Sequence, residues 1–282
     1  MLPVYFFSLL IVVAGFLAYP LISKKYIGGV GYKRFLPIFL GLTALGSFIP
    51  PLLVYHSFPV DLSVIPFLAL LGAMYTVAAY FVFYSLERYN LGIINSIIGS
   101  QQALIAFFDA LLFIESELRN IIIPFIIIIS GIFIVGKSSA GKSRFSKYII
   151  LAFIGTLLWV FMWVLFYTIN TNYPLSYYAV IQSFAFLFCL PVTWLIADKK
   201  VKKEKYGEKM KFIVVAGLMN GIASGIFSFA YKFNALLTPF IVQLTVPLVL
   251  ILSFLLLKER LKKLELVGVI LIILGTFIYI VI

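Results

Sequence analysis

The sequence predicts an all-α integral membrane protein of ten transmembrane helices, arranged as two inverted repeats of five. Three observations predict this fold: the composition, a series of ten apolar segments and a similarity between the two halves. Hydrophobic residues make up 63% of the chain and charged residues 11%, and the mean hydropathy is +1.15. A soluble domain carries about 25% charged residues, so this chain has too little charge to cover a water-exposed surface.

Ten apolar segments are long enough to cross a membrane, which takes about 20 residues of helix. Each must be helical, because backbone inside lipid has to satisfy its own hydrogen bonds. The chain start lacks a basic region and a cleavage motif, so we expect the first segment to be a span and not a signal peptide. The predicted spans are 2–22, 35–55, 64–86, 91–114, 119–136, 148–169, 175–197, 211–231, 236–257 and 264–282.

The distribution of basic residues predicts the topology. Of the 22 Lys and Arg residues, all but Arg119 and Lys232 follow odd-numbered spans. Basic residues stay on the cytoplasmic side, so we expect both termini outside the cytoplasmic membrane. The net charge of +12 therefore indicates topology and not a nucleic-acid partner. The segment Asp198–Lys211 carries seven lysines and is interpreted as an anchor at anionic lipid.

The two halves align when the chain is shifted by 144 residues. The coinciding pairs are Asn90 with Asn234, Glu115 with Glu259, and Gly131 with Gly275. Five spans per half is an odd number, so the second copy enters the membrane from the opposite face, as in alternating-access carriers. We predict repeats at 1–138 and 147–282, joined by a cytoplasmic linker at 139–146. The alternative is chance, because any two apolar sequences align loosely.

The segment PLVLILSFLLLKERLKKLELVGVILIILG, from Pro247 to Gly275, carries a proline, a turn glutamate and two glycines at Pro247, Glu259, Gly268 and Gly275. This segment resembles the C-terminal signature of the drug/metabolite transporter superfamily, in its EamA-like branch. The resemblance implies a ten-helix carrier of small metabolites, often an exporter, with a cavity lined by spans 1, 3, 4, 6, 8 and 9.

The first half keeps less of this signature. Ala103 stands where Pro247 maps and Pro124 where Gly268 maps. The resemblance leaves the substrate open, because the superfamily moves amino acids, sugar phosphates, nucleotide sugars and drugs.

A formal nucleotide-binding motif, GKSSAGKS, occupies residues 136–143. Such a loop needs a strand before it and a helix after it, whose amides hold the phosphates. Here it follows a membrane span, so we interpret it as part of a flexible basic linker. We predict no enzyme activity, no catalytic residues and no cofactor, and the single cysteine excludes a metal–thiolate site.

Polar residues within a span usually face a cavity or another helix. The fourth span carries Asn95, Gln102 and Asp109 at intervals of seven, with Gln101 beside them. Asp109 is the one acidic residue well inside a predicted span. It is either a site for proton or cation coupling or for a substrate amine, or a residue near the rim that is hydrated or paired with Arg119.

Four other spans supply the remaining candidates for substrate binding. Tyr80 and Tyr84 of the third span, and Asn220 and Ser224 of the eighth, form polar stripes, for which helix–helix packing is the alternative. Trp159 and Trp163 of the sixth could hold an apolar or cationic group by ring contact, or form an interfacial belt. The candidates in the ninth span, which two prolines interrupt, are Gln243 and Thr245.

These observations predict a secondary transporter that moves a small polar or amphipathic metabolite, with an amino-acid-like substrate favoured, by alternating access. A sugar-phosphate or nucleotide-sugar exchanger of the same superfamily is one alternative. A membrane scaffold without transport, or a lipid-acting enzyme, is an alternative of another class. The expected partners are the substrate, the lipid bilayer and a coupling proton or ion. The sequence leaves the direction of transport and the oligomeric state open.

Overall fold

The computed structural model describes residues 2–54, 62–89, 91–140, 147–170, 184, 187–196, 207–258 and 262–282, and within them every regular element is a helix. The α-helices of the first half are α1 Leu2–Val30, α2 Tyr32–Val54, α3 Ile65–Arg88, α4 Leu91–Leu112 and α5 Leu118–Ala140. Those of the second half are α6 Lys147–Asn170, α8 Cys189–Ile196, α9 Gly207–Phe233, α10 Leu237–Val242, α11 Thr245–Leu257 and α12 Lys263–Val281. Two short 3-10 helices, η1 Leu62–Val64 and η2 Glu115–Glu117, precede α3 and α5.

Eight helical segments of the described residues are long and apolar enough to cross a membrane, with α10 and α11 counted as one. The chain is therefore a multi-pass membrane protein. Helix α4 is not among the eight; it is 22 residues long and carries the polar side chains predicted above. The seventh predicted span, 175–197, lies largely outside the described residues apart from α8. The count of ten spans stays a prediction.

One boundary was predicted too early. The first span was expected to end at residue 22, before Lys24 and Lys25, but α1 continues to Val30. Charged side chains by themselves do not end a helix; Gly31, with a positive φ of 80°, follows the end of α1 because glycine adopts this conformation without strain.

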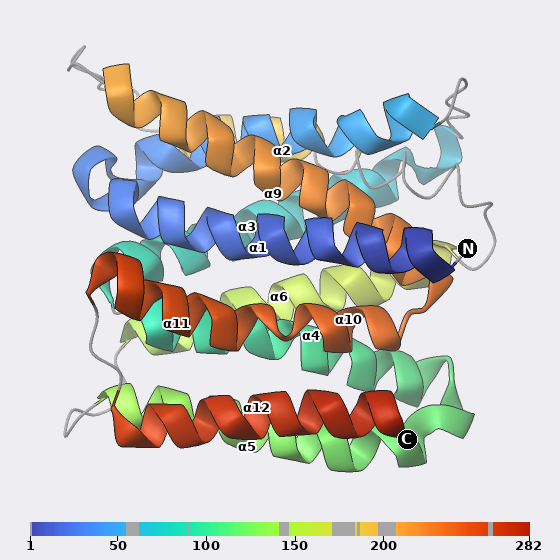
Figure 1. Ribbon diagram of the computed structural model, residues 1–282. Coiled ribbons are helices and arrows are strands. Elements are labelled where there is room, and N and C mark those ends of the chain that lie inside the picture. The colour runs from blue at the N-terminus through green and yellow to red at the C-terminus, as the bar shows by residue number, and fades with distance from the viewer. Residues whose placement is uncertain are drawn as a thin grey trace.

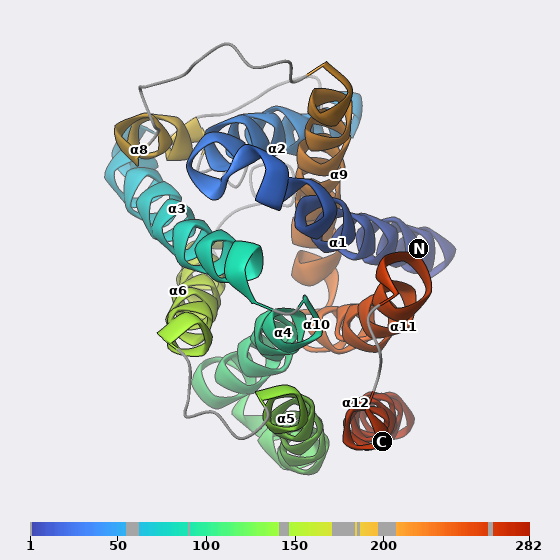
Figure 2. The ribbon, with the colours of Figure 1, turned by 90° about the vertical axis from the view of Figure 1, so that its left-hand side faces the viewer.

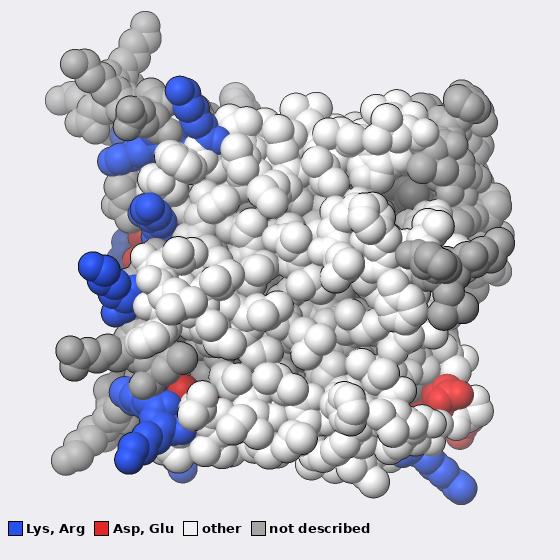
Figure 3. Space-filling model, viewed as in Figure 1, with Lys and Arg blue, Asp and Glu red and all other residues white. Residues whose placement is uncertain are grey.

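The long helices run side by side along one direction, and both ends of the described chain lie at the same end of the bundle (Figure 1). Figure 2 shows the same bundle from its end, with α5 and α12 forming a pair at one edge. Lys and Arg gather at the end away from the termini (Figure 3). We call this the basic end; Lys25, Lys147 and Lys263 belong to it. The described Lys and Arg residues at the opposite end are Arg119, near the start of α5, and Lys232, near the end of α9.

The most extensive helix contacts in the described chain each join a helix of the first half to one of the second: α2 with α9, α5 with α12, α1 with α9 and α3 with α6. Glycines allow the closest approaches. A Cβ at Gly221 would lie 2.2 Å from the carbonyl oxygen of Thr43, and one at Gly268 would lie 2.5 Å from that of Gly131. Small residues let membrane helices approach in this way. Gly268 therefore has a packing role.

Several predicted features fall on residues outside the description: Asn90 and Glu259 of the repeat pairs, the linker beyond Ala140 and most of Asp198–Lys211. The linker was predicted from residue 139, but residues 139–140 still belong to α5. Asn234 caps α10, since its side-chain oxygen accepts hydrogen bonds from the amides of Leu236 at 3.2 Å and Leu237 at 2.8 Å. Asparagine commonly caps the start of a helix in this way.

Candidate functional site

A pocket lies near the middle of the bundle, where helices of both halves meet. Its volume is about 60 Å³. Six helices line it, α1, α3, α4, α6, α9 and α11, and these correspond to the spans that the family resemblance implied. We call it the central pocket. Its lining residues are Phe16, Tyr19, Tyr75, Asn95, Ile98, Gly99, Gln101, Gln102, Trp159, Trp163, Asn220, Ser224, Phe227, Thr245 and Val246.

Eight of the predicted site residues line the central pocket: Asn95, Gln101, Gln102, Trp159, Trp163, Asn220, Ser224 and Thr245. The structure brings these residues together, as expected if polar side chains in a membrane helix turn away from lipid. Trp159 and Trp163 lie in the pocket wall and not in an interfacial belt, whereas Asn220 both lines the pocket and joins helices by hydrogen bonds. Ser224 lines the pocket and is also 4% exposed, so it packs closely as well.

Tyr75 on α3 lines the pocket but was missed. The polar stripe that the sequence suggested contains Tyr80 and Tyr84, and it lies on a neighbouring face of the helix from Tyr75. The signal that could have found Tyr75 is its place near the middle of an apolar span. Asn220 donates hydrogen bonds to the Tyr75 hydroxyl at 3.3 Å and to the Thr43 hydroxyl at 3.2 Å. These bonds hold three helices, α2, α3 and α9, in register at the pocket wall.

Two polar atoms in the pocket wall have no hydrogen-bond partner among the described residues: Trp159 Nε1 and Gln102 Oε1. Both side chains are buried, with 5% and 8% of their surface exposed. Buried polar atoms in proteins are nearly always paired. Trp159 and Gln102 therefore carry one unpaired donor and one unpaired acceptor on residues of the pocket wall.

The ninth predicted span is broken beside the pocket. Helix α10 ends at Val242 and α11 begins at Thr245. Gln243 lies in the break, fully buried, with both amide atoms unpaired among the described residues. Helix α4 comes close here: a Cβ at Gly99 would lie 3.5 Å from Gln243 Nε2 and 2.0 Å from Val246 Cγ2. The structure thus places Gln243 directly behind the pocket wall and Thr245 in it.

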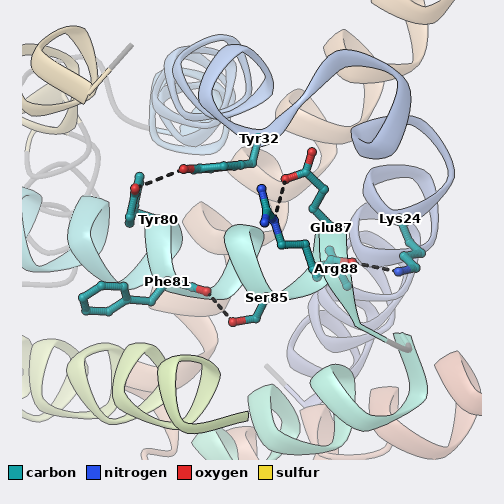
Figure 4. A network of polar contacts seen from close by, with 8 residues as sticks. Lys24, Tyr32, Tyr80, Phe81, Ser85, Glu87 and Arg88 are labelled. Atoms are coloured by element: carbon teal, nitrogen blue, oxygen red, sulfur yellow. Dashed lines mark hydrogen bonds and ion pairs between the residues drawn. The ribbon is translucent and has the colours of Figure 1, made fainter. Parts of the chain in front are cut away.

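Tyr80 and Tyr84 do not line the central pocket, although they were predicted to contact substrate. Tyr80 lies five residues after Tyr75, which moves it by about 7.5 Å along the helix and about 140° around it. It points to Tyr32 of α2, with the two hydroxyl oxygens 3.1 Å apart (Figure 4). The ring of Tyr84 lies 5.0 Å from that of Tyr32 and 4.7 Å from the Arg88 guanidinium.

Lys24 joins α1 to the end of α3 at the basic end. Its ammonium donates hydrogen bonds to the carbonyl oxygens of Leu86 at 2.8 Å and Tyr89 at 2.5 Å (Figure 4). A cation is favourable at a helix C-terminus, where carbonyl groups have no partner in the helix. Arg88, next to these carbonyls, lies 3.8 Å from Glu87. These contacts tie α1 to α3 at the basic end.

Asp109 lies on the other side of the pocket, toward the opposite end. It is fully buried and accepts a hydrogen bond from the Tyr231 hydroxyl of α9. Its second oxygen, Oδ1, has no partner among the described residues. The alternative of a hydrated residue at the rim, or one paired with Arg119, is therefore wrong: Arg119 is exposed and no ion pair joins the two among the residues described.

Comparison with known proteins supports the fold and the family. No curated protein matches the sequence, whereas 28 chains of solved structures match the fold. One of these, a crystal structure described only as that of a protein, is 15% identical and covers 96% of this chain and 94% of its own, with a TM-score of 0.69. At that identity the similarity shows the fold alone. Residues 146–281 match the EamA-like transporter family, so the second half of the chain is similar to this branch of the drug/metabolite transporter superfamily.

Proposed function

We propose that this protein is a secondary transporter that carries a small, amino-acid-like metabolite across the cytoplasmic membrane by alternating access. Its family is one of transporters of drugs and metabolites and not of enzymes. The observation that carries the proposal is the central pocket. It lies where the two halves meet and has unpaired hydrogen-bonding atoms in its wall.

The helix contacts support two inverted repeats of five spans. In such a scheme the first span corresponds to the sixth and the third to the eighth. The contact of α1 with α9 then has an equivalent in the contact of α6 with α3, and both contacts are among the most extensive in the described bundle. Helices α5 and α12, the fifth and tenth spans, pack on each other, as a two-fold axis between them requires.

The basic end supports an orientation with both chain ends outside. Lys and Arg gather at one end of the bundle and the termini lie at the other. Basic residues remain on the cytoplasmic side of a membrane protein. We therefore assign the basic end to the cytoplasm and the opposite end to the outside.

The chemistry of the pocket favours a substrate without a phosphate group. Its described lining residues include no Lys, Arg, Asp or Glu. A phosphate is normally held by charged donors, with Arg the usual choice. A volume of about 60 Å³ has room for about four waters at 10–15 Å³ each. A sugar phosphate or nucleotide sugar fits this pocket poorly, and a compact metabolite fits it better.

The unpaired atoms favour a zwitterion. Trp159 Nε1 can only donate a hydrogen bond, so it suits a carboxylate. Gln102 Oε1 accepts, so it suits an ammonium group. Gln243, which lies behind the pocket wall, offers one donor and one acceptor. The ring of Trp159 lies 5.7 Å from that of Tyr75, and the two form an aromatic surface for the rest of the substrate.

Uptake into proteoliposomes tests this function. The panel contains radiolabelled amino acids, sugar phosphates and nucleotide sugars. We expect uptake of one or more amino acids. Trp159→Phe removes the N–H group and keeps a ring, so it should raise KM by about two- to tenfold, the equivalent of one hydrogen bond of about 0.5–1.5 kcal/mol.

Trp194→Phe is the matched control, because Trp194 is 64% exposed on α8 and far from the pocket lining. Its KM should stay at the native value. Preference for sugar phosphates, or an equal change of KM in the two variants, would contradict the proposed site.

A further inference from the structure

Four aromatic side chains separate the central pocket from the opposite end. We call Trp163, Tyr167, Phe227 and Tyr231 the aromatic layer. The ring of Trp163 lies 4.8 Å from that of Phe227 and 5.8 Å from that of Tyr231. Tyr231 in turn lies 5.6 Å from both Tyr167 and Phe227. Trp163 and Phe227 also line the pocket, so this layer is its wall on that side.

Asp109 is bonded to one member of this layer, Tyr231. Its carboxyl group accepts the hydrogen bond of Tyr231, which lies 122 residues away along the chain. The bond joins α4 of the first half to α9 of the second. Alternating access requires the two halves to move relative to each other. Helices α4 and α9 are not among the extensively packed pairs of the described bundle, so this bond can break without separating a close-packed interface, and we expect it to break when the opposite end opens.

No cation neutralises Asp109 in the described structure. The ionisable groups that face it are Tyr231 of α9 and Tyr167 of α6. The charged groups of the neighbouring elements are Glu115 and Glu117 of η2, Arg119 of α5 and Lys232 of α9, and none of them forms an ion pair with Asp109 among the described residues. Glu117 is bonded to Asn120 at 2.9 Å. Helices α10 and α11 contain no Lys, Arg, His, Asp, Glu or Tyr.

A proton fits this site better than a metal ion. A buried, ionised carboxylate without a cation costs several kcal/mol. A metal ion such as Ca²⁺ takes 6–8 oxygen ligands, whereas the ionisable groups that face Asp109 are the hydroxyls of two tyrosines, Tyr231 and Tyr167. One proton on the unpaired oxygen removes the charge and leaves the bond to Tyr231 intact.

We propose that Asp109 is a proton-binding site that controls the opposite end of the pocket, with Tyr231 as its positioning partner. With the proton bound, the bond between α4 and α9 keeps the aromatic layer closed. Without it, the carboxylate requires water, and the layer separates to admit it. This inference rests on the proposed function, because it assigns the coupling ion of that transporter. One proton changes the ratio of closed to open protein by at most about tenfold per pH unit.

A single-cysteine reporter tests the proposal. Ser228 lies on α9 between Ser224, which lines the pocket, and Tyr231. It is fully buried, so it reacts only when the layer opens. The background is Cys189→Ala, which removes the native cysteine, with Ser228→Cys added. The readout is the rate of labelling of intact cells by a membrane-impermeant maleimide, between about pH 5 and pH 8.

In this background, labelling should rise with pH more steeply than the thiol's own ionisation explains. The Asp109→Asn variant measures the pH dependence that is due to thiol ionisation alone, because its amide stays neutral and still accepts a hydrogen bond from Tyr231. In this variant the cysteine should be labelled slowly, and its labelling rate should vary with pH only as thiol ionisation does. Tyr231→Phe should label faster at low pH, since the bond is absent. Tyr279→Phe, the same change on α12, should behave as the parent.

Two outcomes would overturn the proposal: an Asp109→Asn variant with the parent's pH profile, or labelling that follows replacement of Na⁺ by choline and not pH. The readout needs no substrate. If the uptake panel fails but the labelling shifts as expected, only the proposed substrate is wrong. If uptake succeeds and the labelling does not depend on Asp109, only the proton site is wrong.

Discussion

The two ends of the bundle beyond the central pocket are held together by different chemistry. Toward the basic end, Lys24 holds the carbonyl groups that end α3, and Tyr32 meets Tyr80. Toward the opposite end, the bond is that of Asp109 with Tyr231. Lysine stays charged and the tyrosines neutral in water near neutral pH, whereas a carboxyl group can change its charge when it is hydrated. Of the contacts compared, only the one at the opposite end includes a fully buried carboxyl group, so it is the one that we expect to respond to protons.

The contacts at the two ends also differ in how closely the joined helices pack. At the basic end, Tyr84 and Tyr89 meet Tyr148 of α6, and Tyr26 stacks on Phe212 of α9, within helix pairs that pack extensively. The bond of Asp109 with Tyr231 joins α4 to α9, which are not among the extensively packed pairs of the described bundle. This bond can therefore break without separating a close-packed interface, and it is the better candidate for a gate.

The largest expected effect comes from removing the proton site. Asp109→Asn should abolish substrate accumulation driven by a pH gradient in proteoliposomes. With one proton coupled to each substrate, a gradient of one pH unit is worth about 1.36 kcal/mol and supports about tenfold accumulation. The variant should equilibrate the substrate without concentrating it. Native-like accumulation in Asp109→Asn would show that the opposite end does not bind the coupling ion.

A smaller effect is expected at the basic end. Lys24→Met keeps much of the apolar stem but removes the ammonium that bonds to α3. Hydrogen bonds to a charged group contribute about 1.5–3 kcal/mol, so the variant should have a lower midpoint of thermal unfolding in detergent. Lys25→Met changes an exposed lysine and should keep the native midpoint. The difference between the unfolding midpoints of the two variants should be the same at every pH tested. A difference that varies with pH would weaken the contrast between the two ends of the bundle.

The smallest effect concerns the tyrosine pair. Tyr80→Phe removes one hydroxyl from the contact with Tyr32, which lies away from the pocket lining. We expect a change in transport rate of about two- to tenfold, from a neutral hydrogen bond of about 0.5–1.5 kcal/mol, with KM unchanged. Tyr89→Phe, a nearby tyrosine of the same end, is the control. If KM rose several-fold in Tyr80→Phe, this residue would contact substrate after all.

The polar face of α4 could be predicted from the sequence. Asn95, Gln101 and Gln102 line the pocket as predicted, because a run of amides within an apolar helix has only one favourable direction to point. The same rule did not separate Tyr80, which lies within α3 but away from the pocket lining, since a tyrosine hydroxyl can be satisfied by another tyrosine as well as by a substrate. It also missed Tyr75, which no polar neighbour at helical spacing marked.

The sequence alone determined that this chain is helical and crosses the membrane repeatedly, and that its basic residues lie at one end. These properties follow from composition and from the order of apolar segments, which are local. Only the tertiary structure decided that Tyr231 meets Asp109, that α4 packs against the break before Thr245, and that Trp159 and Gln102 keep unpaired atoms at the pocket. The reason is physical: each of these depends on how two distant helices rotate and slide when glycines let them pack, and no pattern within either helix records that.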